Sequence, residues 1–499
     1  MNRIFGRGAS LALAVTVLVP AAASAGLDTT GTPGLDPNPD PFFPKSGNGG
    51  YEVDHYDVTL KYDPKKNRLK SGTNTSVIAT VTQPDGLTRF DLDYRGPEIA
   101  ELDVTNLDTI VGVPGTFKRK GQELIVKLDT LLPPGAHFKV DVDYRGRAPE
   151  LRDPDGSLEG WSPTKDGAFV VGEPRGTPAW MPSNDHPTDK ATFELAATVP
   201  DSHFVVSNGG FDGGLPTGEG KMTYYWIEPE PMATYLATAT VGRFDVDEDG
   251  NPAGTPSYSL IAVDKKSDRG AVDRTVEIID FLEGTLGTYP FAATGGIVDR
   301  APRVGYALET QTRPIYNSPP SGQLVAHELA HQWLGNNITL KDWSQIWLNE
   351  GFAQWSQWLW AESEGDQTLT ERVDELCEIP ASERKFWNPP PANVPGPEVM
   401  FDATVYDRGA MTVQRLRELI GDTDFSATLD DWLAQDPEGA YQTTDLMDIV
   451  KANTNVDDAT IDEFFIDWTE EGGKPEGCST TGKASLDAAL GVPKLTGLR

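Results

Sequence analysis

The spacing of apolar residues divides the chain into two parts. Between about residues 51 and 245, apolar and polar residues alternate in short runs such as YDVTLKY (56–62) and FKVDVDY (138–144), with Gly, Pro, Asn and Asp between the runs. Alternation places every second side chain on the same face, as in strands that are buried on one side and joined by turns. The first part is therefore predicted to be a β domain spanning residues 51–245.

Beyond about residue 270, apolar residues recur at spacings of three and four. This period is that of one face of an α-helix, and it occurs in AVDRTVEIIDFLEGTLG (271–287), MTVQRLRELIG (411–421) and TIDEFFIDWTEEGG (460–473). By contrast, FWNPPPANVPGPEVM (386–400) contains five prolines and is predicted to be a loop. The fold class is therefore predicted to be α+β and multidomain, with a mainly helical domain over residues 246–475.

The two ends of the chain follow neither pattern. Residues 1–25 combine a basic start, an apolar stretch and the small residues Ala23-Ser24-Ala25, which is the pattern of a cleaved secretory signal peptide. Residues 26–50 are rich in Gly, Pro and Asp and are predicted to form a flexible leader, and residues 476–499 a C-terminal tail. We therefore expect a secreted, extracellular protein.

Charge and apolar content narrow the range of partners. The chain has 76 acidic and 42 basic residues and a net charge of −34. Such a surface repels nucleic acids and anionic membranes, and no later apolar run is long enough to cross a bilayer. We expect no nucleic acid partner, no membrane partner and a monomer, although the same acidity also suits a surface that only keeps a protein in solution.

The sequence contains two cysteines, Cys377 and Cys478. In the oxidising environment of an exported protein they are expected to form a disulfide. A closed loop of about 100 residues would stabilise the fold by roughly 4 to 5 kcal/mol. A catalytic use is disfavoured because no histidine lies near either cysteine in the sequence.

The run VAHELAHQWLG (325–335) places charged and polar groups in an otherwise apolar segment. In a helix, His327 and His331 lie one turn apart on one face, and Glu328 falls between them. Two imidazoles with this spacing can bind one tetrahedral zinc ion while the carboxylate lies over the open coordination position. The alternative, two histidines packed in the core, becomes untenable if a third ligand is present.

Glu350, in WLNEGFAQW (347–355), supplies that third ligand. It follows His331 with 18 residues between them, beyond a break at Gly335-Asn336-Asn337 and on what should be a second helix. Short connections give antiparallel helix neighbours, so Glu350 can return to the level of the histidines. We predict one Zn²⁺ per chain, bound by His327, His331 and Glu350 with one coordination position left open.

These residues resemble the zinc aminopeptidases typified by aminopeptidase N and leukotriene A hydrolase, a group of gluzincin peptidases. HELAHQWLGNNITLKDWSQIWLNEGFA (327–353) matches the family signature over its full length, and the similarity extends from about residue 50 to 475. Further similar segments are WMPSNDHPTDKATFEL (180–195), VVSNG (205–209) and TYLATATVGRFD (234–245). The resemblance implies an antiparallel β saddle domain followed by a thermolysin-like catalytic domain. We expect this chain to lack the family's large helical C-terminal domain, because it ends at Arg499.

The resemblance also implies catalytic roles for two residues. Glu328 would act as the general base that accepts a proton from a zinc-activated water and passes it to the leaving amine. Tyr406, in VYDRGAM (405–411), matches the tyrosine that hydrogen-bonds the developing oxyanion. Arg408 stands where the family has lysine.

Substrate anchoring is less well matched to the family. Glu309, in YALET (306–310), matches the glutamate that binds the free amino terminus in the family's GAMEN motif, but Tyr306, Leu308 and Thr310 differ from it. Glu173 lies where the family usually has glutamine, and is either a second amine anchor or an ordinary surface acid.

We therefore expect a secreted zinc metallo-aminopeptidase that acts on peptides with a free N-terminus. Two alternatives stay open. A thermolysin-like endopeptidase would use the same zinc chemistry without an amine anchor. A non-catalytic binding module on the same scaffold should have lost a ligand or the base, and none is missing here.

Overall fold

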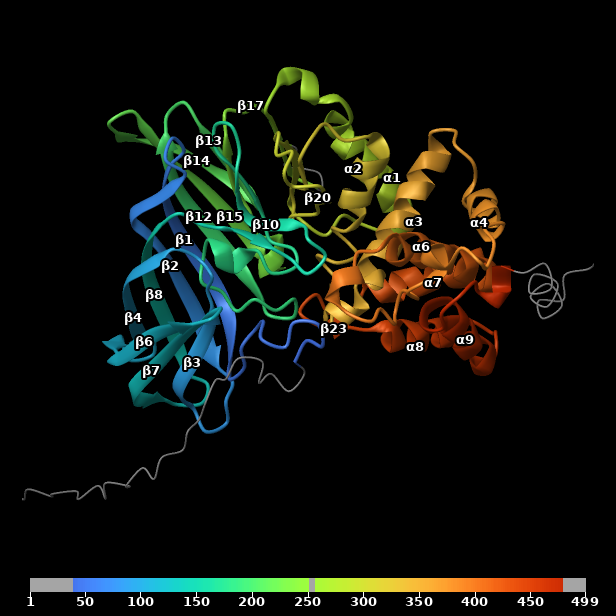
Figure 1. Ribbon diagram of the computed structural model, residues 1–499, viewed down its shortest axis with the longest axis horizontal. Helices are drawn as coiled ribbons and strands as arrows, with labels where there is room; N and C mark the ends of the chain where they lie inside the picture. Colours follow the sequence, from blue (N-terminus) through green and yellow to red (C-terminus); the bar gives the residue numbers. More distant parts are fainter. Residues whose placement is uncertain (1–38, 251–255, 479–499) are drawn as a thin grey trace, which may run out of the picture.

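The computed structural model describes residues 39–250 and 256–478. The predicted signal peptide, the first part of the predicted leader and most of the predicted tail lie outside this range. Figure 1 shows a sheet-rich half, coloured blue to green, beside a helical half coloured yellow to red. Among the described residues, no helix combines the length and apolarity needed to cross a bilayer.

The first half is built on one large sheet of eight strands. Its strands, in spatial order, are β14 (Gly210–Gly218), β15 (Lys221–Ala233), β12 (Lys190–Pro200), β1 (Tyr51–Asp63), β2 (Arg68–Val81), β8 (His137–Gly146), β4 (Glu98–Asn106) and β5 (Val111–Gly112). All neighbours are antiparallel except β1 and β12, which pair in parallel. The predicted antiparallel β domain is thus present, with one parallel pair.

Two smaller sheets complete this half. One has the order β13 (Phe204–Ser207), β16 (Ala239–Gly242), β11 (Ala168–Val171), β10 (Leu158–Pro163) and β9 (Glu150–Arg152). The other has the order β3 (Leu87–Asp93), β7 (Glu123–Leu132) and β6 (Gly115–Lys120). Alternation sets the core: on β1, Tyr56, Val58 and Leu60 are buried whereas Asp57 and Lys61 are exposed.

The second half contains a sheet that the apolar pattern did not predict. Its order is β17 (Asp245–Gly250), β18 (Tyr258–Val263), β19 (Ala293–Val298), β21 (Ile315–Tyr316) and β20 (Ala307–Leu308). All six residues of β19 are buried. A strand covered on both faces has no polar side to alternate with, so its sequence does not show the period of two. A short parallel pair joins β22 (Thr339–Leu340) to β23 (Ala440–Tyr441).

Helices make up most of the rest. They are α1 (Thr275–Leu286), α2 (Gly322–Ala330), α3 (Trp347–Ser363), α4 (Leu369–Cys377), α5 (Arg384–Trp387), α6 (Ala403–Ile420), α7 (Asp422–Leu433), α8 (Thr443–Asn453) and α9 (Asp458–Phe465). The helix predicted over residues 460–473 changes to a π-helical turn at Ile466. The proline-rich stretch forms a loop apart from the end of α5 and a short 3₁₀ turn, Pro397–Val399.

The predicted leader differs from the structure over residues 39–50, which are packed rather than free. Asp40 is buried, and its carboxylate accepts hydrogen bonds from the backbone N–H of Phe43 and of Trp343 in the helical half, both at 2.7 Å. The ring of Phe43 lies edge-on to Trp343 and under the guanidinium of Arg175. A composition rich in Gly and Pro concealed these anchors, because their partners lie far away in the sequence.

Candidate active site

Three predicted ligands meet between α2 and α3. His327 lies on α2, His331 caps its C-terminus, and Glu350 lies in the first turn of α3. The Nε2 atoms of the histidines are 3.2 Å apart, and Glu350 Oε2 is 3.2 Å from His327 Nε2 and 3.3 Å from His331 Nε2. Donors that share a tetrahedral zinc with bonds of 2.0 to 2.1 Å lie roughly 3.3 Å apart. The three side chains therefore fit one zinc ion.

Hydrogen bonds and charge prepare these ligands for a cation. His331 Nδ1 lies 3.1 Å from the carbonyl oxygen of Leu334, which fixes the ring and leaves Nε2 for the metal. Burial acts to raise the pKa of Glu350, but His331 and then His327 outweigh it and lower the pKa to about 2. Glu350 is thus held as the carboxylate that a zinc ion requires.

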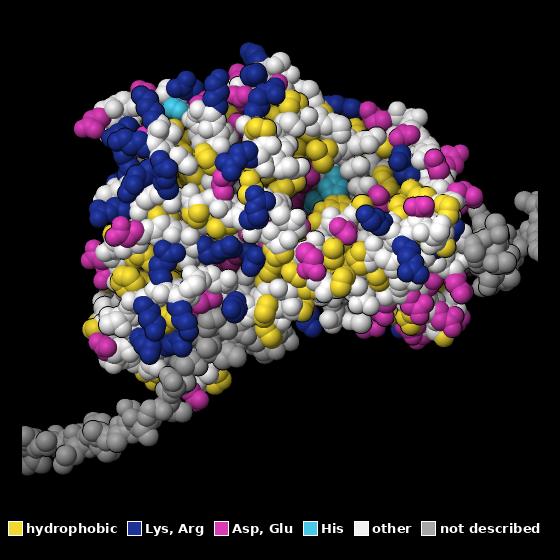
Figure 2. All heavy atoms as spheres, in the orientation of Figure 1, with side chains coloured by type: hydrophobic (Ala, Val, Ile, Leu, Met, Phe, Trp, Pro, Cys, Tyr) yellow, Lys and Arg dark blue, Asp and Glu magenta, His cyan; other side chains and the backbone are white. Residues whose placement is uncertain are grey.

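The ligands lie at the bottom of a cavity of about 760 Å³ between the two halves. In Figure 2 histidine atoms are visible in a hollow between the sheet-rich and helical halves, so the site opens to solvent. Both halves contribute to the walls: Glu173 and Leu158 come from the first, and Glu309 and Tyr406 from the second. A substrate that reaches the metal ligands must therefore contact both domains.

Glu328 also faces this cavity from α2. Its carboxylate is buried, and its oxygen lies in one close group with ligand atoms of Glu309 and His331, all within 4.8 Å. Burial is the main cause that raises the pKa of Glu328 well above its ordinary value. The structure therefore places the predicted base beside the predicted metal site.

Glu309 and Glu173 bring two more carboxylates into the cavity. Glu309 is 2% exposed and Glu173 8%, and one oxygen of each, Oε1, has no hydrogen-bond partner among the described residues. Burial and the nearby Glu309 raise the pKa of Glu173, and burial raises that of Glu309 to about 7. Unpaired buried carboxylates are costly unless a cation joins them, so this end of the cavity suits a positively charged ligand.

The position of Glu309 is fixed through its backbone. Its carbonyl oxygen accepts hydrogen bonds from Asn336 Nδ2 at 2.8 Å and Gln332 Nε2 at 3.1 Å. Both donors lie just beyond the histidines in the sequence: Gln332 comes directly after His331, and Asn336 follows four residues later. These hydrogen bonds therefore hold Glu309 at a fixed position relative to the metal ligands.

Tyr406 lines the same cavity from α6. Its ring stacks on His327 with centroids 5.9 Å apart and an interplanar angle of 24°. Burial raises the pKa of Tyr406 well above its ordinary value, so the phenol keeps its proton and can donate a hydrogen bond.

Arg408, two residues after Tyr406, has a different task. Its buried guanidinium donates to five backbone carbonyls, those of Trp387, Asp467, Trp468, Glu471 and Gly473. It thus fixes the end of the helical half against α6 and does not face the cavity.

Lys190 was missed at the sequence level. Its half-buried ammonium group donates to the carbonyl oxygens of Asn336 at 2.7 Å, Asn337 at 3.0 Å and Pro437 at 2.9 Å. It thereby ties the start of β12, the strand that contains the KATF match, to the turn that follows the histidines. The only indication in the sequence was that Lys190 lies in a segment that resembles the family.

The remaining sequence prediction concerns the cysteines. Cys377 at the end of α4 and Cys478 form a disulfide that closes a sequence separation of 101 residues. Lys474 Nζ also donates to the carbonyl oxygen of Cys377. The disulfide lies outside the cavity lining and ties the described end of the chain to α4.

Comparison with known protein families agrees with this geometry. The Peptidase M1 N-terminal domain matches residues 52–236, and the Peptidase family M1 domain matches residues 307–468. The chain belongs to peptidase family M1. The family resemblance and the α+β, multidomain fold class predicted from the sequence are therefore confirmed for this M1 chain.

Similar proteins cover the M1 chain to different extents. Aminopeptidase M1-B from Oryza sativa subsp. japonica is 28% identical over 60% of this chain and 36% of the relative. Probable aminopeptidase 1 from Saccharolobus solfataricus is 27% identical over 78% of this chain and 50% of the relative. The chain thus spans about a third to a half of the length of these curated relatives.

Solved structures match nearly end to end. A two-domain M1 zinc metallopeptidase bound to L-arginine has a TM-score of 0.76 at 27% identity, covering 87% of this chain and 98% of that one. The M1 zinc metallopeptidase from Deinococcus radiodurans has a TM-score of 0.74 at 28% identity, covering 88% and 98%. The M1 chain shares their two-domain architecture, and zinc is the metal of this family.

Proposed function

We propose that this chain is an aminopeptidase that removes the N-terminal residue of peptides at a zinc site. One observation carries the proposal: the cavity that holds His327, His331 and Glu350 also holds Glu309 and Glu173, whose buried Oε1 atoms have no partner among the described residues. An α-ammonium group bound there would satisfy both carboxylates. It would also set how far the peptide enters, so that the first peptide bond lies at the metal.

The side chains around that bond have complementary tasks. Zinc, when bound, supplies a Lewis acid that lowers the pKa of a water molecule to about 7. Glu328 would accept the proton from the attacking water and deliver it to the leaving amine. The Tyr406 phenol would donate a hydrogen bond to the carbonyl oxygen as negative charge develops on it, worth about 3 to 4 kcal/mol in comparable sites.

The free edge of strand β20 could bind the backbone of a peptide substrate. β20 is an edge strand of its sheet: among the described residues it pairs only with β21. Its residue Ala307 lines the cavity. An unpaired strand edge can bind an extended peptide through backbone hydrogen bonds. This arrangement supports peptides as the substrate class.

Blocking the amino terminus separates this proposal from an endopeptidase. The assay compares hydrolysis of a free aminoacyl anilide with that of its N-acetylated form, and uses Glu328→Gln as a control that keeps the ligands. An aminopeptidase cleaves only the free form. Equal cleavage of both forms would favour the endopeptidase, and absence of cleavage with zinc bound would favour a binding module.

We also propose that the chain acts outside the cell as a monomer. The signal-peptide pattern of residues 1–25 and the disulfide between Cys377 and Cys478 support export. Expression with the native N-terminus should yield protein in the external fraction that begins near Gly26 and has the mass of one chain by light scattering. Retention inside the cell with an intact N-terminus would contradict export.

A further inference from the structure

The active-site cavity has an acidic floor and carries two arginines, together with Asp155, among its exposed lining residues. Its buried floor carries four carboxylates, from Glu173, Glu309, Glu328 and Glu350. The cationic side chains in its lining are Arg152 and Arg303, and both are exposed at the mouth. Figure 2 shows basic side chains on the sheet-rich side of the hollow. A ligand with a positive and a negative end would therefore enter with its positive end first.

A bound peptide has a defined direction in this cavity. With its ammonium group at Glu309, just after β20, as in the function proposed above, a peptide antiparallel to β20 would run back toward the residues that precede this strand. Arg303 lies in the turn before β20, six positions upstream of Glu309. Because an extended peptide advances about 3.3 Å per residue, the end of a chain of three to five residues comes within reach of a long arginine side chain at this point.

Both arginines keep donors available for such a ligand. Arg303, 59% exposed, uses Nη2 to bind Glu150 Oε2 at 2.7 Å, and Arg152 uses Nη1 to bind the carbonyl oxygen of Gly156. Each guanidinium has five N–H donors, so several remain on each side chain. The nearby Asp155 carboxylate is engaged by the N–H and hydroxyl of Ser157.

The two arginines come from different domains that are joined at this rim. Arg152 belongs to β9 of the first half, whereas Arg303 precedes β20 of the second. The hydroxyl of Tyr306 donates to the carbonyl oxygen of Leu158 at 3.0 Å, and Arg303 pairs with Glu150. These two contacts join, across the domain boundary, the segments that carry the two arginines.

We propose that Arg152 and Arg303 bind the C-terminal carboxylate of short peptides, so that the preferred substrates are peptides of three to five residues with a free C-terminus. This role rests on the aminopeptidase function proposed above. It adds a selection for peptide length and for an unmodified C-terminus that the zinc site and the amine anchors cannot supply.

The test compares tetra-alanine with its C-terminal amide, which differ only at the carboxylate. For the unmodified enzyme, kcat/KM should be about tenfold higher for the free acid, as expected for charge-assisted hydrogen bonds at a solvated rim. Arg152→Gln and Arg303→Gln should each reduce this ratio, and the double variant should bring it near one. Alanine p-nitroanilide has no carboxylate, so its hydrolysis should stay unchanged in all variants.

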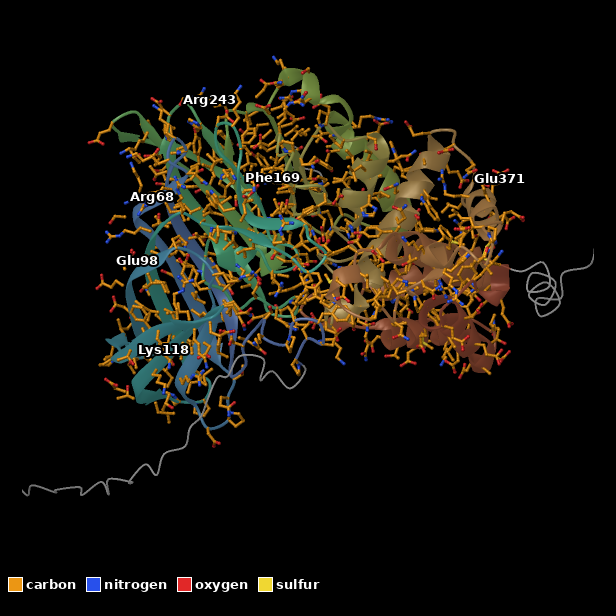
Figure 3. All side chains as sticks on the ribbon, in the orientation of Figure 1. Arg68, Glu98, Lys118, Phe169, Arg243 and Glu371 are labelled. Atoms are coloured by element: carbon orange, nitrogen blue, oxygen red, sulfur yellow. A yellow bond between two sulfur atoms is a disulfide. The ribbon has the colours of Figure 1, made fainter. Side chains whose placement is uncertain are left out.

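A matched control removes an arginine elsewhere. Arg68 is exposed on β2 and is labelled in Figure 3 on the outer side of the sheet-rich half, away from the cavity lining. Arg68→Gln should keep the full preference for the free acid.

Three outcomes would overturn the proposal in distinguishable ways. Equal kcat/KM for the acid and the amide in the unmodified enzyme would contradict it without the need for any variant. A preference that persists in the double variant would assign carboxylate binding to other residues. If even the anilide is not hydrolysed, the proposed aminopeptidase function is wrong, and the role proposed for the two arginines is contradicted as well.

Discussion

Gly351 of α3 and Gly409 of α6 are in direct backbone contact. A Cβ atom on Gly351 would lie 2.9 Å from both the Cα and the carbonyl carbon of Gly409. This contact lets the helix that carries Glu350 approach the helix that carries Tyr406. The distance between a metal ligand and the proposed oxyanion donor is therefore set by two residues without side chains.

Adding one methyl group at this contact should disturb the metal site. Gly351→Ala must push α3 away from the backbone of α6, at a cost of about 1 to 3 kcal/mol for overpacking. We expect a lower melting temperature and at least tenfold weaker zinc affinity, measured by calorimetry and by competition with a chelator. Gly284→Ala in α1 is the matched control, since a Cβ there meets no atom within 4 Å. Unchanged zinc affinity in Gly351→Ala would show that the contact does not position Glu350.

Removing the Lys190 ammonium should loosen the turn after the histidines. Lys190→Met leaves the carbonyl oxygens of Asn336, Asn337 and Pro437 without this donor. Asn336 is buried, and an unsatisfied buried group typically costs about 1 to 3 kcal/mol. We expect lower stability in urea unfolding and a several-fold lower kcat/KM. Lys65→Met removes an exposed lysine of the same domain and should change neither quantity. A Lys190→Met variant as stable and active as its parent would contradict a role in joining the domains.

Neutralising one amine anchor should weaken binding of free amines. Glu309→Gln keeps the shape of the side chain but removes the charge that would pair with an α-ammonium group. Charge-assisted hydrogen bonds contribute about 1.5 to 3 kcal/mol, so kcat/KM for alanine p-nitroanilide should fall roughly 10- to 100-fold while zinc content stays constant. Glu98→Gln, at an exposed site labelled in Figure 3, should leave kcat/KM unchanged. If Glu309→Gln has no effect, the amine is bound elsewhere.

The disulfide should affect stability and not chemistry. Replacing both cysteines, Cys377→Ser with Cys478→Ser, opens a loop with a sequence separation of 101 residues. In the chain-entropy model this costs roughly 4 to 5 kcal/mol of unfolding free energy. Calorimetry should show a clearly lower melting temperature, whereas zinc content and activity at 25 °C should match those of the parent. Lost activity in a still folded variant would contradict a purely structural role.

The sequence was most informative where chemistry requires a fixed spacing. His327, His331 and Glu350 could be predicted as one group because helical periodicity brings the histidines to one face and a short connection returns the next helix beside them. Glu309 and Tyr406 required the resemblance, because nothing in their local pattern distinguishes them from other residues of their kind. Glu173 stayed ambiguous until the fold buried its side chain in the same cavity as Glu309.

Other features depend on contacts between distant segments. The β17–β21 sheet was missed because strands such as β19 are buried on both faces and lack alternation. Asp40 and Phe43 were assigned to a flexible leader because their partners, Trp343 and Arg175, lie far away in the sequence. Lys190 was overlooked because its partners are backbone carbonyls, which carry no sequence signal.

Zinc analysis of purified protein is the most direct test of the central claim, that His327, His331 and Glu350 bind one ion. The unmodified chain and the Glu328→Gln variant should each contain one zinc per chain, whereas Glu350→Gln should lose most of its metal. Zinc content that is unaffected by Glu350→Gln, or absent from the unmodified chain after dialysis against zinc, would contradict the proposed centre.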